Sequence, residues 1–155
     1  MCHFTPPLTA EQHAAVTASK QVIYDGFREA IANGLPKERA GILVDEEFGT
    51  DILRDAVRRG YVTAVSTELS GSDEFEFEFG DDFAAHIEAI SPTFAKVLVR
   101  YNPEGDAALN ARQTARLKRL SDYCRRAGQA FMFELPVPAT TVQLDRVTAV
   151  QPGYA

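Results

Sequence analysis

The stretch of residues 95–106 constrains the fold most strongly, because it reads as a buried strand that ends in a charged turn. Residues 97–99 form the apolar run typical of a parallel strand that is covered on both faces. The Asn-Pro-Glu-Gly-Asp sequence at 102–106 predicts a turn, since proline fixes φ and glycine permits a positive φ. An amphipathic helix is expected from Ala107 onward. Strand, turn and helix in this order predict an α/β fold, in which chemistry collects at the carboxyl ends of the strands.

The same alternation extends along the rest of the chain. Short apolar runs predict strands at 41–44, 61–65, 94–99 and 130–135, and helical spacing predicts helices at 11–33, 49–59, 81–90 and 107–126, with one more at 139–147. Thr9 is the expected N-cap of the first helix, and Gly128 is expected to end the fourth. The connections are too long for hairpins, so they favour a parallel sheet with crossover helices. We therefore predict an N-terminal tail at 1–10 and one domain at 11–155.

Composition excludes several classes of function. The chain has 155 residues, 45% of them hydrophobic, which suffices for one compact core. Its net charge is −6, and its basic residues do not cluster in a stripe along the sequence. Nucleic acid is therefore not an expected partner. No apolar run approaches the roughly 20 residues of a membrane span, and no signal-peptide core is present, so a cytoplasmic protein is expected. Cys2 and Cys124 match no metal or redox spacing, and Cys124 is expected to be a small core residue.

Charged residues gather at the expected strand ends. Asp45, Glu68, Arg100 and Glu134 follow or end the four strands, and Lys96 lies within the third. Parallel strands bring these ends to one edge of the sheet, where Arg100 also places its charge. We expect the side chains of Lys96, Glu134, Glu68 and Asp45 to converge there. A lysine and a glutamate on adjacent strands perturb each other's pKa and suit proton transfer. The alternative is an ion pair that only stabilises the end of the sheet.

Other polar and aromatic positions carry weaker signals. The Asp-Glu-Glu sequence at 45–47 offers oxygen ligands for a divalent cation, although an acidic cap of a helix explains it better. His86 is expected at the surface or at the core edge, and we predict no metal site. No Gly-rich nucleotide fingerprint is present, so no cofactor is predicted. Phenylalanine and glutamate alternate at 74–79, which indicates a strand or a loop that packs its aromatic rings inward.

Five stretches of the chain together resemble one protein family. They are residues 20–27, 41–46, 73–78, 96–106 and 131–135. In order, they resemble the aldolase-like C-terminal module of bacterial 5-dehydro-2-deoxygluconokinase proteins, which act in myo-inositol catabolism, and the resemblance covers about residues 8–154. More distantly the chain is similar to class I tagatose- and fructose-bisphosphate aldolases.

The resemblance implies a TIM (β/α)8 barrel of which this chain supplies about four βα units. Such barrels typically need about 250 residues. On the family's pattern the chain begins after the first strand and stops after the fifth. We therefore expect a half-barrel or a truncated barrel, either a fragment of a longer protein or a natural short gene product.

The resemblance also implies roles for individual residues. Lys96 would contact substrate oxyanions and Glu134 would transfer protons, with Asp45, Glu68 and Arg100 contacting a phosphorylated keto sugar. The lysine that forms a Schiff base in this family lies on a sixth strand, which the chain does not contain. Leu69 stands where the family usually has lysine in a Glu-Lys-Ser-Gly sequence, and Leu135-Pro136 replaces a pair of leucines.

Two hypotheses follow from these matches and departures. The chain is either an aldolase-like lyase domain, inactive by itself for want of the Schiff-base lysine, or a non-catalytic half-barrel that acts by association. A four-strand slice of a barrel leaves two unpaired edges, which invite pairing with another chain. We therefore expect a homo-oligomer, most simply a dimer in which two chains supply about eight strands, or else a poorly soluble fragment.

Overall fold

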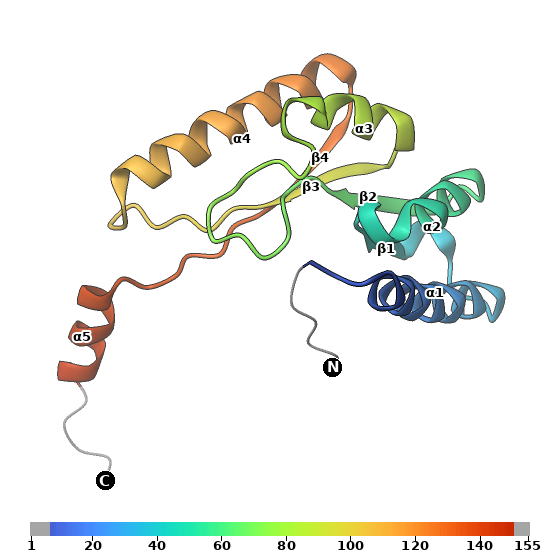
Figure 1. The fold of residues 1–155 in the computed structure, drawn as a ribbon, viewed down its shortest axis with the longest axis horizontal. Helices are drawn as coiled ribbons and strands as arrows, with labels where there is room; N and C mark the ends of the chain where they lie inside the picture. The colour runs from blue at the N-terminus through green and yellow to red at the C-terminus, as the bar shows by residue number, and fades with distance from the viewer. Residues whose placement is uncertain (1–6, 151–155) are drawn as a thin grey trace, which may run out of the picture.

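The computed structural model describes residues 7–150 as an α/β fold built on one four-stranded parallel sheet (Figure 1). The strands are β1 (Gly41–Val44), β2 (Val62–Ser66), β3 (Phe94–Leu98) and β4 (Ala130–Glu134); the helices are α1 (Ala10–Ala32), α2 (Glu46–Arg58), α3 (Phe83–Ile90), α4 (Ala107–Ala127) and α5 (Thr141–Val150), with short 3-10 turns η1 (Lys37–Arg39) and η2 (Gly80–Asp82). The strand order is β1-β2-β3-β4, and each neighbouring pair is parallel. The predicted α/β class and the parallel sheet are confirmed.

Helices cover one face of this sheet. One cluster of buried side chains joins β3 to α3, α4 and the loop after β2; it contains Phe75, Phe77, Phe83, Ile87, Ala95, Val97, Val99, Leu120, Tyr123 and Cys124. A second cluster joins β1 and β2 to α1, α2 and the end of α3; it contains Tyr24, Val44, Ile52, Leu53, Ala56, Val65 and Ile90. Cys124 is thus a core residue, as predicted, and the paired phenylalanines Phe75 and Phe77 pack inward.

The two faces of β3 are covered to different degrees. Ala95 and Val97 join the helix-covered core, whereas on the other face Lys96 is buried and Leu98 is only half-buried. The expected cover on both faces of β3 therefore holds only in part. The register places Lys96 beside Ser66 and Met132, so these three side chains share the other face. On that face Leu43 is 52% exposed and Met132 39% exposed. Sequential strands with helices on one face are compatible with half of a βα barrel, whose inner face this would be.

The helix boundaries follow from their caps. Thr9 and Gln12 form a reciprocal capping box at the start of α1, and Gly128 ends α4 at φ 67°, both as predicted. The second helix begins at Glu46 instead of the predicted 49, because the Asp45 carboxylate accepts a hydrogen bond from the Phe48 N–H at 2.9 Å. The third begins at Phe83, since η2 occupies the residues just before it.

The described side chains of α5 belong to neither buried cluster. In Figure 1, α5 lies apart from the sheet, at the end of an extended segment that follows β4. Of the predicted tail 1–10, residues 1–6 and with them Cys2 lie outside the described residues, and α1 begins at Ala10. Within residues 7–150, each helix is too short or too polar to cross a membrane.

The contact of α2 with β1 gives a test of the fold. A Cβ at Gly49 would lie 2.0 Å from Cγ1 of Val44, a side chain that is only 6% exposed. We expect Gly49→Ala to lower the free energy of unfolding by about 1–3 kcal/mol, because the core must shift to accept the methyl group. Gly26→Ala is the matched control, since nothing lies within 4 Å of its Cβ position. It should stabilise α1 by about 0.5–1 kcal/mol. Equal effects in urea denaturation would contradict this packing.

Candidate functional site

Lys96 is the centre of a charged cluster at the carboxyl ends of the strands. Its side chain is 8% exposed, and its Nζ lies 2.6 Å from Oε1 of Glu68 and 3.0 Å from Oε2 of Glu134. Leu98 pairs with Glu134 in the sheet, which brings the end of β4 beside β3. The Thr67 hydroxyl donates to the Lys96 carbonyl at 2.9 Å and fixes the approach of Glu68. Three of the five predicted residues therefore meet around one ammonium group.

The electrostatics of this cluster keep Lys96 charged. Burial acts to lower the pKa of Lys96, but the hydrogen bonds to Glu68 and Glu134 outweigh it, so the pKa is raised above its ordinary value. A lysine must be neutral to attack a carbonyl, so Lys96 acts here as a cation and hydrogen-bond donor. Oε2 of Glu68 is buried and has no hydrogen-bond partner among the described residues. A bound hydroxyl would satisfy this oxygen.

A cavity of about 190 Å³ lies next to the cluster. Glu68 and Leu98 line it together with Arg100 and the 69–75 segment of the loop that follows β2. The exposed Arg100 guanidinium donates to the Ser72 carbonyl at 3.2 Å and forms no ion pair with any described residue. Leu69 also lines this cavity. Arg100 is therefore the cation available to an anionic ligand here.

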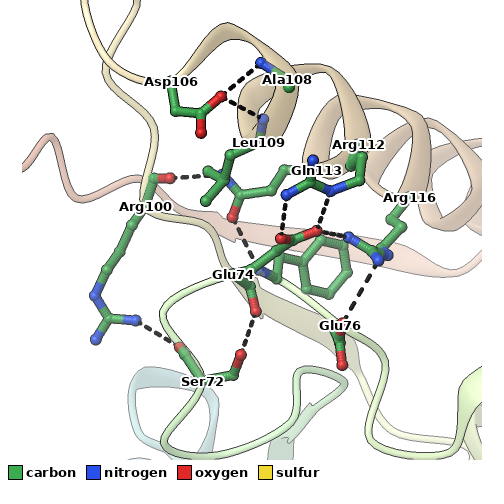
Figure 2. A network of polar contacts seen from close by, with 11 residues as sticks. Ser72, Glu74, Glu76, Arg100, Asp106, Ala108, Leu109, Arg112, Gln113 and Arg116 are labelled. Carbon is green, nitrogen blue, oxygen red and sulfur yellow. Dashed lines mark hydrogen bonds and ion pairs between the residues drawn. The ribbon is translucent and has the colours of Figure 1, made fainter.

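Helix α4 holds the wall of this cavity in place (Figure 2). The Glu74 carboxylate receives hydrogen bonds from Arg112, at 2.7 and 2.9 Å, and from Arg116. These bonds lower the pKa of Glu74 to about 2, so it stays ionised and clamped. The fully buried Gln113 accepts from the Phe75 N–H at 2.8 Å and donates to the Arg100 carbonyl at 2.9 Å. Gln113 thus joins the loop after β2 to the end of β3.

A second cavity, of about 240 Å³, lies between α1, the start of α2 and the end of β2. Glu68 and Ser70 line both cavities, so Glu68 stands at their common wall. Asp45 lines the second cavity, where it caps α2 and pairs with Lys20. The helix-cap interpretation of Asp45 is therefore confirmed. Asp45 and Arg100 make no direct contact with Lys96, but each lines a cavity that Glu68 also lines at this edge of the sheet.

The sequence interpretation missed two residues of the second cavity, Glu78 and Lys20. Burial, and then the nearby carboxylates of Asp45 and Glu47, raise the pKa of Glu78 to about 7. A carboxyl group with such a pKa exchanges protons readily at neutral pH. The signal in the sequence was the alternation of phenylalanine and glutamate at 74–79. It predicted only that Glu78 is a polar residue between phenylalanines that pack inward. Nothing in it placed Glu78 against acids more than thirty residues away.

His86 and the acidic turn complete this region. His86 Nδ1 lies 2.9 Å from Oε1 of Glu46, and its ring stacks on Phe79 with centroids 3.6 Å apart. His86 is half-buried at the core edge, as predicted. Within the described part of the chain, no three histidine, cysteine or acidic side chains are arranged to hold a metal ion.

Comparison with known proteins places the chain in a family. Residues 8–151 match the family described as "Uncharacterized protein conserved in bacteria" (DUF2090). The chain belongs to DUF2090. No curated protein matches this DUF2090 chain.

Proposed function

We propose that this DUF2090 chain is an aldolase-like domain of carbohydrate metabolism that binds a phosphorylated keto sugar at the carboxyl edge of its sheet. The observation that carries the proposal is the buried Lys96 ammonium, held between Glu68 and Glu134 beside an open cavity. A sugar hydroxyl or a developing oxyanion can replace one carboxylate as the partner of Lys96. Glu134, 54% exposed, is free to move and transfer a proton. The resemblance to the inositol-catabolic module supports a cytoplasmic role and this class of substrate.

The proposed role of Lys96 is electrostatic. Because its pKa is raised, Lys96 stabilises negative charge on a substrate oxygen and does not form an imine. The chain's other lysines are Lys20, Lys37 and Lys118. Lys20 is paired with Asp45, Lys118 with Asp122 on the surface of α4, and Lys37 lies in η1. None lines the cavity beside Lys96. We therefore propose that this domain binds the sugar without Schiff-base turnover of its own.

Borohydride trapping tests this role. We expect no mass increase when the chain is reduced with borohydride in the presence of dihydroxyacetone phosphate, because the raised pKa of Lys96 keeps its ammonium group charged. Isothermal titration without borohydride should show that the same compound binds and that Glu134→Gln weakens it. A trapped adduct that disappears in Lys96→Ala would show that Lys96 is a nucleophile, contrary to the proposal.

A second candidate function is a non-catalytic half-barrel that acts by self-association. Among the described strands, β1 and β4 each have a single neighbour, and the uncovered face exposes Leu43 and Met132. Pairing of β4 in one chain with β1 in another would satisfy both edges and cover this face. Sedimentation at micromolar concentrations tests it: a dimer supports this candidate, and a stable monomer rules it out.

A further inference from the structure

Glu78 is an unpaired carboxyl group that lines the second cavity. Its backbone is fixed, because the Glu78 N–H donates to the Thr67 carbonyl at 3.1 Å, while Glu68 and Phe77 form an antiparallel bridge. The following turn is closed by the Gly80 N–H, which donates to the Phe77 carbonyl at 3.2 Å. The Glu78 side chain is half-buried and makes no hydrogen bond or ion pair with any described residue. The fold thus presents this carboxyl group to the cavity and gives it no partner.

The groups around Glu78 come from every element that borders the cavity. Asp45, Glu46 and Glu47 lie at the start of α2, Glu68 follows β2, and the Lys20 ammonium of α1 is already paired with Asp45. The carboxylates, together with burial, raise the pKa of Glu78 to about 7. Below that pH Glu78 is a neutral acid, whose proton has no acceptor among the described residues.

The lining of the cavity defines the chemistry of its ligand. Carboxylates of Asp45 and Glu47 accept hydrogen bonds from hydroxyl groups and repel anions, whereas Val16 and Phe48 offer apolar contact. When Glu78 is a neutral carboxylic acid, its O–H group is a strong hydrogen-bond donor. An uncharged carbonyl oxygen of the ligand is a suitable acceptor for it, because a carbonyl oxygen only accepts hydrogen bonds. A phosphate group is excluded here and finds its cation at Arg100, beside the other cavity.

We propose that Glu78 donates a hydrogen bond to the carbonyl oxygen of a keto sugar whose uncharged, hydroxylated end occupies the second cavity. This inference rests on the proposed function and assigns the part of the ligand that binds at this end of the site. Glu68, at the common wall, faces the ligand from both cavities. Glu78 thus recognises the carbonyl, while Lys96 and Arg100 recognise the oxyanion and phosphate portions.

The pH dependence of binding tests the inference. The probe is dihydroxyacetone phosphate, whose ketone is not masked in a ring, and its dissociation constant is measured at pH 6 and pH 8 for wild type, Glu78→Gln and Glu76→Gln. Ionisation of Glu78 leaves about a tenth of the wild type competent at pH 8, so the dissociation constant should rise about tenfold. The glutamine amide donates at both pH values, so Glu78→Gln should lose this rise. Glu76 is exposed and precedes Glu78 on the same loop, so Glu76→Gln should retain it.

Two results would overturn the inference about Glu78, and only the second would also reject the proposed function. If Glu78→Gln keeps the same pH dependence as wild type while Glu134→Gln weakens binding, only the role of Glu78 is rejected. If dihydroxyacetone phosphate binds none of the variants at either pH, the proposed function fails and this inference fails with it. Matching thermal unfolding of all four proteins at pH 6 shows that the folds being compared are the same.

Discussion

Lys96→Met is expected to lower the free energy of unfolding by about 3–5 kcal/mol at pH 8, because it leaves a buried carboxylate without its cation. The group left behind is Glu68, whose side chain is 16% exposed and whose Oε2 is already unpartnered. Glu134 is 54% exposed and is rehydrated when Lys96 is removed. Urea denaturation at pH 8 measures this loss.

Two further variants test whether the lost stability comes from the unpaired charge on Glu68 or from the change of side chain at residue 96. Lys96→Met combined with Glu68→Gln should recover most of the lost stability, because neither buried charge remains. Glu134→Gln alone should change stability by less than about 1 kcal/mol, as expected for an exposed partner. A loss in Lys96→Met that is as small as that of Glu134→Gln would mean that Glu68 reaches water easily, contrary to the described burial.

Gln113→Leu is expected to cost about 2–4 kcal/mol, since it removes the partner of both the Phe75 N–H and the Arg100 carbonyl. The leucine fits a site that is fully buried, so the penalty comes from the two backbone groups that lose their partner rather than from a cavity. The Phe75 amide should also exchange its hydrogen faster, because that bond fixes the loop that lines the first cavity. Denaturation and hydrogen exchange measure these effects separately.

Arg112→Gln on the same helix is the control. Arg112 is 51% exposed, and Glu74 keeps its contact with Arg116 when Arg112 is replaced. This variant should therefore lose less than about 1 kcal/mol. If Gln113→Leu and Arg112→Gln lower the free energy of unfolding by equally small amounts, the stability of the loop after β2 does not depend on the buried Gln113 amide.

Local patterns in the sequence predicted the elements of the fold, because each strand and cap is encoded by adjacent residues. The apolar run at 41–44 coincides with β1, and Thr9 and Gly128 cap their helices as expected. The parallel order followed from long connections between strands. The uncovered face of the sheet was not predictable from the 97–99 run, since an apolar residue on an open face has the same local pattern as a buried one.

The site was predicted only where it depends on strand ends. Lys96, Glu68 and Glu134 were recognised because parallel strands align their carboxyl ends. The Lys20–Asp45 pair and the surroundings of Glu78 depend on how α1 and α2 pack, which no local pattern records. Gln113 did leave a signal: it is a polar residue one turn from both Leu109 and Leu117, on the apolar face of α4.

Mapping dihydroxyacetone phosphate onto the chain by amide chemical shifts tests the central claim most directly. If the keto sugar binds at the carboxyl edge of the sheet, the shifts should concentrate at residues 66–72, 96–100 and 134, and Glu134→Gln should reduce them. Shifts confined to α5 or to the outer surface of α4, or no shifts at millimolar ligand, would contradict a keto-sugar site around Lys96.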